Sequence, residues 1–574
     1  MSGHSNLDLA LFEIAVENAA RHHGKARMES VLGRALALHP ELRGDPEVAK
    51  KLVSEAVERV NALPERDLIR LWKERSSGRP EPSRSSPSPE EVLPPLPNAR
   101  PGGVVLRFAP FPSGPLHIGN SRAVFVNDEY RRRYRGRFLL VLDDTAGSED
   151  KKILPEAYDL IPEDLDLVGV RVDAILYKSD RLERHYHYVP QLIAQGDAYV
   201  CTCPADQLRE NRRRGRACPE RDRPPEFHLE HWERMKAGGY RTGEAVLRLK
   251  TSLADPDPAF RDRVLFRIWE GVHPRVGTRY RVWPLLEYSW AIDDVELGIT
   301  HVIRGKDLIM EGKMEETLWQ RLRMVPPVVI NWGLLRVRDA KISKSKSARE
   351  VQTGVYDGWS DPRTWTLRSL LRRGIRPEAL RAFILSFGLS QADIEVPAEA
   401  LYAENRRLLD PTTPRRIFVP RPRKVRVVGF PPDLREITLP NHPDREELGS
   451  RTLPLDGRFV LPEEDLLRHR GDVIRLKDLL NARVPPSWEG GEIPLEFVDR
   501  PNRPLPRIQW LPSEFTVQTD VLLPDGILVS GLGERTLEGS REGEVFQFER
   551  FGFVRLDSPP RSAQGSLRFV YGHP

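Results

Sequence analysis

Hydrophobic residues near the start of the chain repeat at the spacing of an amphipathic helix. Leu7, Leu11 and Ile14 fall on one stripe, which predicts a helix that ends near Gly24. A second helix is predicted to open at Asp45-Pro46, where a capping residue precedes a proline in the first turn. These patterns indicate a small helical module.

A stretch rich in proline and serine follows this module. It begins at Gly78 and runs to Pro97 with few apolar residues, so it cannot bury a core of its own. We therefore expect residues 1–77 to form a separate helical unit and residues 78–101 to be a linker.

Beyond the linker, short apolar runs alternate with helical spacing. Residues 104–108 and 138–142 read as strands, with a helix expected to start near Ile118 between them. A strand, a helix and a strand within about 40 residues are typical of the βαβ unit of a parallel, nucleotide-binding sheet. Sheet-like runs resume near residue 299, after a segment at about 201–270 whose arginine, proline and charge content reads as an insertion.

The spacing of the apolar residues changes again in the last third of the chain. Residues from about 360 to 410 have helical spacing, and short apolar runs separated by proline and glycine begin at Arg423, Asp472 and Glu544. Many short strands with turn signals favour β-barrels or sandwiches. The expected fold class is therefore multidomain, with an α/β core, an N-terminal helical module and an all-β C-terminal part.

Composition narrows the class of protein. Hydrophobic residues make up 39% and charged residues 30%, which excludes a disordered chain. No apolar run approaches the roughly 20 residues of a membrane span, no secretory signal follows Met1, and three cysteines are not a disulfide framework. We expect a reducing, cytoplasmic setting and no membrane partner. A net charge of +5 permits a polyanionic partner without demonstrating one.

The first segment with candidate chemistry is the loop between the first strand and its helix. Pro112, Gly114, His117, Gly119 and Asn120 lie there. The glycines let a nucleotide approach the backbone, the helix start favours phosphate, and the histidine can donate a hydrogen bond to a phosphate oxygen. A plain turn with an incidental histidine is the alternative reading.

The second candidate segment, Lys341-Ile-Ser-Lys-Ser-Lys, follows a strand-like run. Lysines interleaved with serines suit the charge that develops on a leaving polyphosphate. Taken alone, this segment reads more readily as a solvated basic turn.

Together the two segments resemble the HIGH and KMSKS sequences of class I aminoacyl-tRNA synthetases, in the same order across a split nucleotide-binding fold. The resemblance extends to the glutamyl/glutaminyl subclass through residues 107–120, 142–145, 178–183, 198–203 and 358–368. Residues 547–555 resemble the last barrel of its archaeal/eukaryotic branch.

The resemblance implies a domain order. A Rossmann-type catalytic domain is expected in two halves, at 102–200 and 271–346, separated by an acceptor-end-binding insertion at 201–270. A helical connector at 347–412 and two β-barrel anticodon-binding domains at 413–574 are expected to follow.

The resemblance also implies site residues. His117 and Lys344 match catalytic positions, and ATP binding falls to Pro112, Gly114, His117, Gly119, Asn120, Lys341, Ser343 and Lys344. Arg107, Asp143 and Arg304 match substrate positions: Asp143 receives the substrate ammonium, and Arg304 can pair with a side-chain carboxylate. A structural ion pair is the alternative for each of these three.

Three departures from the family stand out. Asn120 replaces a second histidine at the end of the first motif, and Leu286 stands where the substrate pocket commonly has a tyrosine. Cys201, Cys203 and Cys218 resemble a zinc knuckle that some relatives carry, but Glu220 occupies the place of the fourth cysteine. His228 or His231 could substitute. We expect buried, reduced cysteines and assign no metal ligands.

The implied activity is that of an enzyme that activates glutamate with ATP and Mg²⁺ and transfers it to the 3′ end of tRNA(Glu). Charging of tRNA(Gln) stays open. The alternatives are a glutaminyl enzyme, which usually carries a small neutral residue at the position of Arg304, and an inactive tRNA-binding paralogue. His117, Lys341 and Lys344 argue against the paralogue because all three are intact.

Overall fold

The computed structural model describes residues 3–21, 46–63, 92–146, 152–338, 344–558 and 565–574, with residues 25, 26, 28, 31, 32, 35, 67 and 340. The chain divides into two compact units, residues 1–87 and 88–574. None of the helices within these described ranges is long and apolar enough to cross a membrane.

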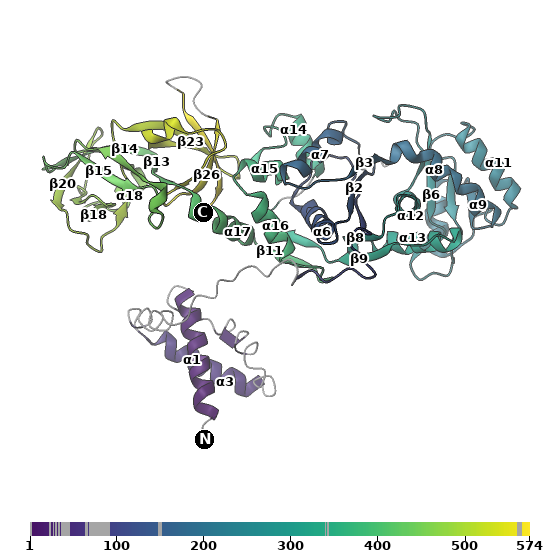
Figure 1. Ribbon diagram of the computed structural model, residues 1–574, viewed down its shortest axis with the longest axis horizontal. Helices are drawn as coiled ribbons and strands as arrows, with labels where there is room; N and C mark the ends of the chain where they lie inside the picture. Colours follow the sequence, from purple (N-terminus) through teal and green to yellow (C-terminus); the bar gives the residue numbers. More distant parts are fainter. Residues whose placement is uncertain are drawn as a thin grey trace. The chain divides into compact units, whose positions relative to one another are not determined.

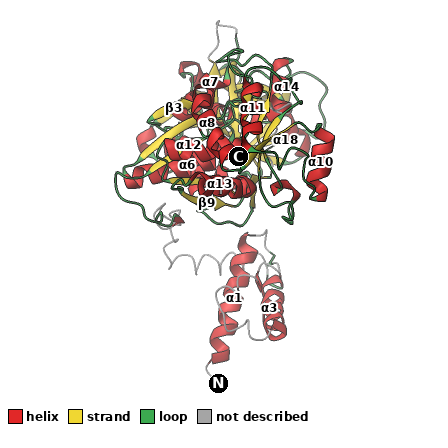
Figure 2. Ribbon diagram, turned by 90° about the vertical axis from the view of Figure 1, so that its right-hand side faces the viewer, coloured by secondary structure: helices red, strands yellow, loops and turns green. Residues whose placement is uncertain are grey.

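The first unit contains two described helices of two turns or more, α1 (Gly3–Arg21) and α3 (Pro46–Asn61). They lie side by side in both views (Figures 1 and 2) and bury Leu11, Ala15 and Val53 between them. The predicted helices are confirmed, and the stripe that predicted the first one faces the core because helical residues four apart share a face.

The second unit begins with a parallel sheet. Its first strands are β1 (Val105–Phe108), β2 (Arg137–Leu142) and β3 (Ala174–Tyr177), with the helices α6 (Ile118–Tyr134) and α7 (Ala157–Leu167) between them. β8 (His301–Gly305) pairs in parallel with β9 (Val328–Trp332). The N–H of Thr300 donates to the carbonyl of Val105 at 3.0 Å, which places β8 beside β1. The order β3-β2-β1-β8-β9 is that of a nucleotide-binding α/β sheet, as predicted.

Along the chain, between the segments that form the two halves of this sheet, lies a separate antiparallel layer with its own hydrophobic core. Its strands, in order, are β4 (Ala198–Cys201), β5 (Val246–Leu249), β6 (Val264–Ile268) and β7 (Val282–Pro284). The surrounding helices are α8 (Leu182–His187), α9 (Val189–Ala194), α10 (Ala205–Arg214), α11 (Pro225–Lys236), α12 (Leu286–Glu296) and α13 (Ile309–Leu322). Trp232, Phe266 and Tyr288 pack at its centre.

The segment after β9 returns to the parallel sheet. It comprises β10 (Leu335–Val337), α14 (Lys344–Gln352), α15 (Leu367–Arg372), α16 (Pro377–Leu385), β11 (Ile394–Val396) and α17 (Glu399–Leu409). Leu367, Phe383 and Leu401 share one core with Leu106 and Phe125 of the sheet and α6. The predicted helical stretch is therefore confirmed, and it packs as part of the catalytic core rather than apart from it.

The last part consists of two seven-stranded sheets, as the many short strands predicted. One contains β12 (Arg415–Arg416), β13 (Phe418–Pro420), β23 (Thr516–Leu522), β24 (Leu528–Glu534), β25 (Val545–Phe548), β26 (Gly552–Ser558) and β27 (Leu567–His573). The other contains β14 (Pro422–Val428), β17 (Arg458–Pro462), β18 (Val473–Leu476), β19 (Leu480–Arg483), β20 (Ile493–Asp499), β21 (Arg507–Ile508) and β22 (Leu511–Pro512). The chain starts in the first sheet, builds the second and then returns to complete the first.

Two smaller elements accompany the second sheet. A two-stranded hairpin is formed by β15 (Glu436–Pro440) and β16 (Ser450–Pro454), and a short helix, α18 (Glu463–Arg468), follows β17. Figure 1 shows β14, β18 and β20 in one group and β23 and β26 in the other.

Candidate active site

The loop between β1 and α6 ends in a capping box. The Nδ1 atom of His117 accepts a hydrogen bond from the Gly119 N–H at 3.0 Å, and the His117 N–H donates to Oδ1 of Asn120 at 3.2 Å. These reciprocal bonds determine where α6 begins, and the start of a helix presents N–H groups that favour phosphate. Asn120 therefore has a structural role as the third helical residue of the box.

Two distant segments hold this loop. The Leu116 N–H donates to Oδ2 of Asp164 at 2.6 Å, and the Leu116 carbonyl accepts from the Leu367 N–H at 2.8 Å. Arg368 Nε donates to the other oxygen of Asp164 at 2.9 Å. Burial raises the pKa of Asp164 to about 6, although Arg368 opposes the shift. The segment 358–368, which carries part of the family resemblance, thus supports the His117 loop.

Of the remaining residues of the predicted ATP site, the structure describes the two in the first motif but not the side chains in the second. Gly114 has a φ of +142°, and a Cβ there would lie 3.3 Å from the Trp359 ring, so glycine suits this position on both counts. The Pro112 carbonyl accepts from the Leu154 N–H at 2.9 Å. Lys341 and Ser343 lie outside the described residues, as does the side chain of Lys344, the first residue of α14.

Buried charged residues lie at the carboxyl ends of four neighbouring strands. Arg107 lies in β1, Asp143 follows β2, Lys178 follows β3 and Arg304 lies in β8. Their exposed fractions are 6%, 2%, 0% and 5%. Ligands of open α/β sheets bind at this edge. The structure therefore brings the three predicted substrate residues together and adds Lys178.

Both arginines of this group have carboxylate partners. Arg107 donates to Asp294 from Nε and Nη2 at 2.5 and 2.8 Å, and Arg304 donates to Glu315 from Nη1 and Nη2, both at 2.8 Å. Burial acts to lower the pKa of Arg107, but Asp294 outweighs it and the pKa is raised. Burial raises the pKa of Glu315 despite the Arg304 guanidinium.

Lys178 is the third cation of the group. Its Nζ donates to Ser289 Oγ at 2.6 Å and lies 3.4 Å from Oδ1 of Asp143. Burial lowers the pKa of Lys178, and the Asp143 carboxylate counteracts this. Three positive charges are therefore balanced by three carboxylates, which is how a protein tolerates charge in its interior.

One indole ring lies among the three cations. The ring centroid of Trp290 in α12 is 4.7 Å from Cζ of Arg107, 5.1 Å from Nζ of Lys178 and 5.3 Å from Cζ of Arg304. The face of an indole attracts cations. Trp290 therefore lies at the centre of a group that we call the Trp290 cluster: Arg107, Asp143, Lys178, Trp290, Asp294, Arg304 and Glu315.

Sequence reasoning missed four members of this cluster: Lys178, Trp290, Asp294 and Glu315. One signal was available, because Asp293-Asp294 follows the apolar run Trp290-Ala-Ile, and acidic residues on the apolar side of a helix need buried partners. Nothing in the sequence linked Glu315 to Arg304. Their pairing depends on how the chain turns between β8 and α13 and on which face of α13 meets β8.

Family comparisons agree with this architecture. A model described as tRNA synthetases class I (E and Q), catalytic domain, matches residues 103–411. Two models described as the anti-codon binding domain of the same synthetases match residues 413–493 and 507–557. The chain belongs to this family of class I tRNA synthetases.

Relatives of this synthetase match it over almost its whole length. A protein named glutamate–tRNA ligase from Methanopyrus kandleri is 40% identical over 569 residues, which is 97% of this chain and 98% of the relative. One of the same name from Pyrococcus furiosus is 41% identical over 562 residues, 95% of this chain and 96% of the relative. A crystal structure of a glutamate tRNA ligase from Elizabethkingia meningosepticum in complex with its amino acid covers 53% of this chain and 69% of that chain at 19% identity, with a TM-score of 0.40.

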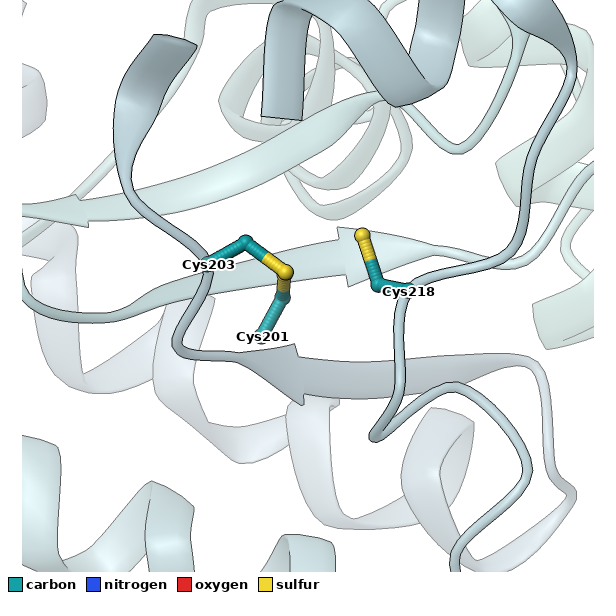
Figure 3. Close-up of side chains that lie close together, drawn as sticks. All are labelled: Cys201, Cys203 and Cys218. Carbon is teal, nitrogen blue, oxygen red and sulfur yellow. The ribbon is translucent and has the colours of Figure 1, made fainter. Parts of the chain in front are cut away.

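The three cysteines of this synthetase lie together in the antiparallel layer. Figure 3 shows Cys201, Cys203 and Cys218 pointing toward one another, and their sulfur atoms lie within 4.8 Å of one another. This spacing can hold a metal ion, but a structural zinc takes four tight ligands. Arg248 Nη1 donates to Cys218 Sγ at 2.9 Å, whereas Glu220 Oε2 is 4.0 Å from Cys203 Sγ.

Neither of the two histidines considered as replacement ligands belongs to the group of possible ligand atoms that lie within 4.8 Å of one another. His228 Nδ1 accepts from the Val200 N–H at 3.3 Å, and the His231 ring contacts the Tyr240 hydroxyl. Hydrogen bonds led by that of Cys201, with a contribution from Arg248, lower the pKa of Cys218 to about 5. Among the described residues no fourth ligand joins the three sulfur atoms, and the Arg248 guanidinium already donates to Cys218 Sγ, so these residues fit a four-ligand zinc site poorly.

A pocket of about 270 Å³ lies between the two C-terminal sheets of the synthetase. It is lined by Arg415, Lys477, Arg507, Gln509, Gln547, Glu549 and Arg550. Glu549 accepts from Lys477 at 2.6 and 2.7 Å and from Gln509 at 2.8 Å. With four cationic side chains and one carboxylate, the lining suits a ligand that is anionic or rich in acceptors.

Proposed function

We propose that the chain is a glutamate–tRNA ligase, which activates glutamate with ATP and transfers it to the 3′ end of tRNA(Glu). Full-length similarity to proteins of that name supports the activity. The observation that carries the choice of glutamate over glutamine is the buried guanidinium of Arg304 at the carboxyl end of β8. A guanidinium favours a carboxylate over a neutral carboxamide because only the carboxylate forms a charge-assisted pair.

The proposed first step needs no covalent bond to a side chain. The His117 loop and the start of α6 would hold ATP with its Mg²⁺ ion, and Lys344 of the second motif would stabilise the charge on the leaving pyrophosphate. An oxygen of the glutamate α-carboxylate attacks the α-phosphorus, and the bond to pyrophosphate breaks. Glutamyl-adenylate forms, and catalysis consists of positioning and charge stabilisation.

The proposed second step uses the tRNA. A hydroxyl of the terminal ribose attacks the glutamyl carbonyl carbon, AMP leaves with the bonding electron pair, and the hydroxyl proton is released. The antiparallel layer, which includes residues 201–270, would hold the acceptor end. The cavity between the C-terminal sheets would receive an acceptor-rich anticodon base, with residues 347–412 connecting the two sites.

Two further assignments belong to this proposal. The thiols are held by Arg248 rather than by zinc, so the purified protein should contain no stoichiometric zinc and should keep its melting temperature with EDTA. One zinc per chain would contradict this. The location is cytoplasmic, where ATP and tRNA meet.

The test is ATP–pyrophosphate exchange with glutamate or glutamine, tRNA present, followed by charging of purified tRNA(Glu) and tRNA(Gln). Exchange with glutamate and charging of tRNA(Glu) are expected. Faster exchange with glutamine would replace the proposal by a glutaminyl enzyme, and no exchange with either would indicate an inactive tRNA-binding paralogue. The assay with tRNA(Gln) shows whether the enzyme glutamylates that tRNA in addition to tRNA(Glu).

A further inference from the structure

The Trp290 cluster contains two buried hydrogen-bond donors without an acceptor. The indole Nε1 of Trp290 and the Nε of Arg304 make no hydrogen bond within the described part of the chain, and both residues are 5% exposed. Tryptophan Nε1 atoms are unpaired elsewhere too, at Trp232 and Trp283, but the Trp290 ring centroid lies 5.3 Å from Cζ of Arg304, so here two unpaired donors are available to one ligand. A charged acceptor would pair with these two donors more strongly than a neutral one, because charge-assisted hydrogen bonds are the stronger kind.

Glu315 explains why one edge of the Arg304 guanidinium remains available. Its two oxygens take Nη1 and Nη2, each at 2.8 Å, so the ion pair uses the end of the guanidinium. The Nε edge is separate from that end and can receive a second carboxylate. The ion pair therefore positions Arg304 without using all its donors.

We propose that Trp290 Nε1–H and Arg304 Nε–H together bind the side-chain carboxylate of glutamate and that Trp290 is a specificity-determining residue of the reaction. This inference rests on the proposed function. Both groups can only donate, so the ligand must accept at two atoms. A carboxylate has two acceptor oxygens, whereas the carboxamide of glutamine has one oxygen and one NH₂ that would face a donor.

The test is Trp290→Phe, which keeps an aromatic ring among the cations and removes only the N–H. The KM for glutamate should rise about 10- to 100-fold, the loss of one charge-assisted hydrogen bond, with a smaller change in kcat. Glutamine should lose less, so the preference for glutamate over glutamine falls. Exchange is measured with tRNA present.

Trp319→Phe is the matched control. Trp319 is equally buried, and its Nε1 donates to the Ala291 carbonyl at 2.8 Å, so the variant loses an N–H outside the cluster. It should lower the melting temperature without changing the ratio of the two substrates. A second readout is the indole ¹H–¹⁵N resonance of Trp290, identified by its absence in Trp290→Phe, which should shift when glutamate is added to the wild type.

The outcomes separate this inference from the proposed function. If the wild type does not use glutamate, the function is wrong. If it does, an unchanged KM and an unchanged ratio in Trp290→Phe overturn the role of Trp290 alone. Equal losses for both substrates, or an indole resonance that ignores glutamate, would likewise assign the ring a purely structural role.

Discussion

The His117 loop and the Trp290 cluster are built in opposite ways. In the loop, every one of these hydrogen bonds has a backbone group on at least one side: the two bonds of the capping box, and those of the Leu116 N–H and carbonyl with Asp164 and Leu367. The cluster is held by charged side chains that pair across long separations, such as Arg107 with Asp294. ATP is common to all class I synthetases, so a site for its phosphates can depend on backbone groups. Selection of one amino acid requires specific side chains.

The largest expected loss of activity follows a substitution in the Trp290 cluster. Arg304→Cys removes the guanidinium and leaves Glu315 and the substrate carboxylate without their partner. Truncating one member of a desolvated pair costs roughly 2–5 kcal/mol, or about thirtyfold to several thousandfold in kcat/KM for glutamate. Glutamine should lose far less. Pyrophosphate exchange with both substrates, tRNA present, gives the ratio.

Arg263→Cys is the control for Arg304→Cys. Arg263 also pairs with a buried carboxylate, that of Glu287, but lies outside the cluster. Its variant should affect both amino acids equally. A well-folded Arg304→Cys enzyme with an unchanged glutamate-to-glutamine ratio would make Arg304 structural, and the choice of glutamate would lose its main support.

Substitutions in the predicted ATP site should change the rate of adenylate formation rather than the preference for glutamate over glutamine. Lys344→Ala should slow adenylate formation on the order of 10²–10³-fold, because its contact strengthens as pyrophosphate leaves. The KM for glutamate and the preference over glutamine should stay nearly constant. Lys346→Ala, two residues later, is the matched control in exchange assays. Near-normal exchange by Lys344→Ala would refute the assignment.

The support of the His117 loop should show in the pH dependence of stability. The pKa of Asp164 is raised from 3.8 to about 6, so between these values the folded state binds more protons than the unfolded state. Its contribution to the free energy of unfolding is therefore fully present below about pH 4 and falls as pH rises through 6, by at most about 3 kcal/mol.

Asp164→Asn keeps an acceptor for Leu116 and abolishes this titration. Relative to wild type, the variant should gain in urea-unfolding free energy as pH rises from 4 to 6.5. An unchanging difference between the two proteins across that range would show that Asp164 titrates normally.

The smallest effect is expected outside both sites. Deletion of residues 1–77 should leave exchange kinetics nearly unchanged, because the chain divides into compact units at 87/88 and residues 88–574 contain both sites. Kinetics and melting temperature of the truncated and full chains provide the measurement. A truncated protein that folds but cannot activate glutamate would assign the helical module to the catalytic fold.

Local features of the structure followed from the sequence. The helix at Ile118, the strands on either side of it and the many short C-terminal strands were predictable because periodicity and turn residues act within a few positions. The path of the chain between the two C-terminal sheets was not, since β12 and β13 pair with strands about 100 residues away.

The candidate site shows the same division. Residues of the His117 loop could be named from one segment, and the family resemblance pointed to Arg107, Asp143 and Arg304. The pairing of Arg304 with Glu315 could not be foreseen, because it depends on how the face of α13 meets β8. Asn120 was expected only to bind ATP, and its hydrogen bond with the His117 N–H became visible only in the side-chain geometry of the loop.

By itself, the sequence determined the multidomain fold class and the chemistry available at each motif, because these depend on composition and short-range pattern, and the resemblance of its motifs indicated the family. Only the tertiary structure decided which charges meet. Arg107, Lys178 and Arg304 come from three separate strand ends and converge on one indole from α12. Buried charges must find partners wherever the packed chain places them, and that requirement acts through space rather than along the sequence.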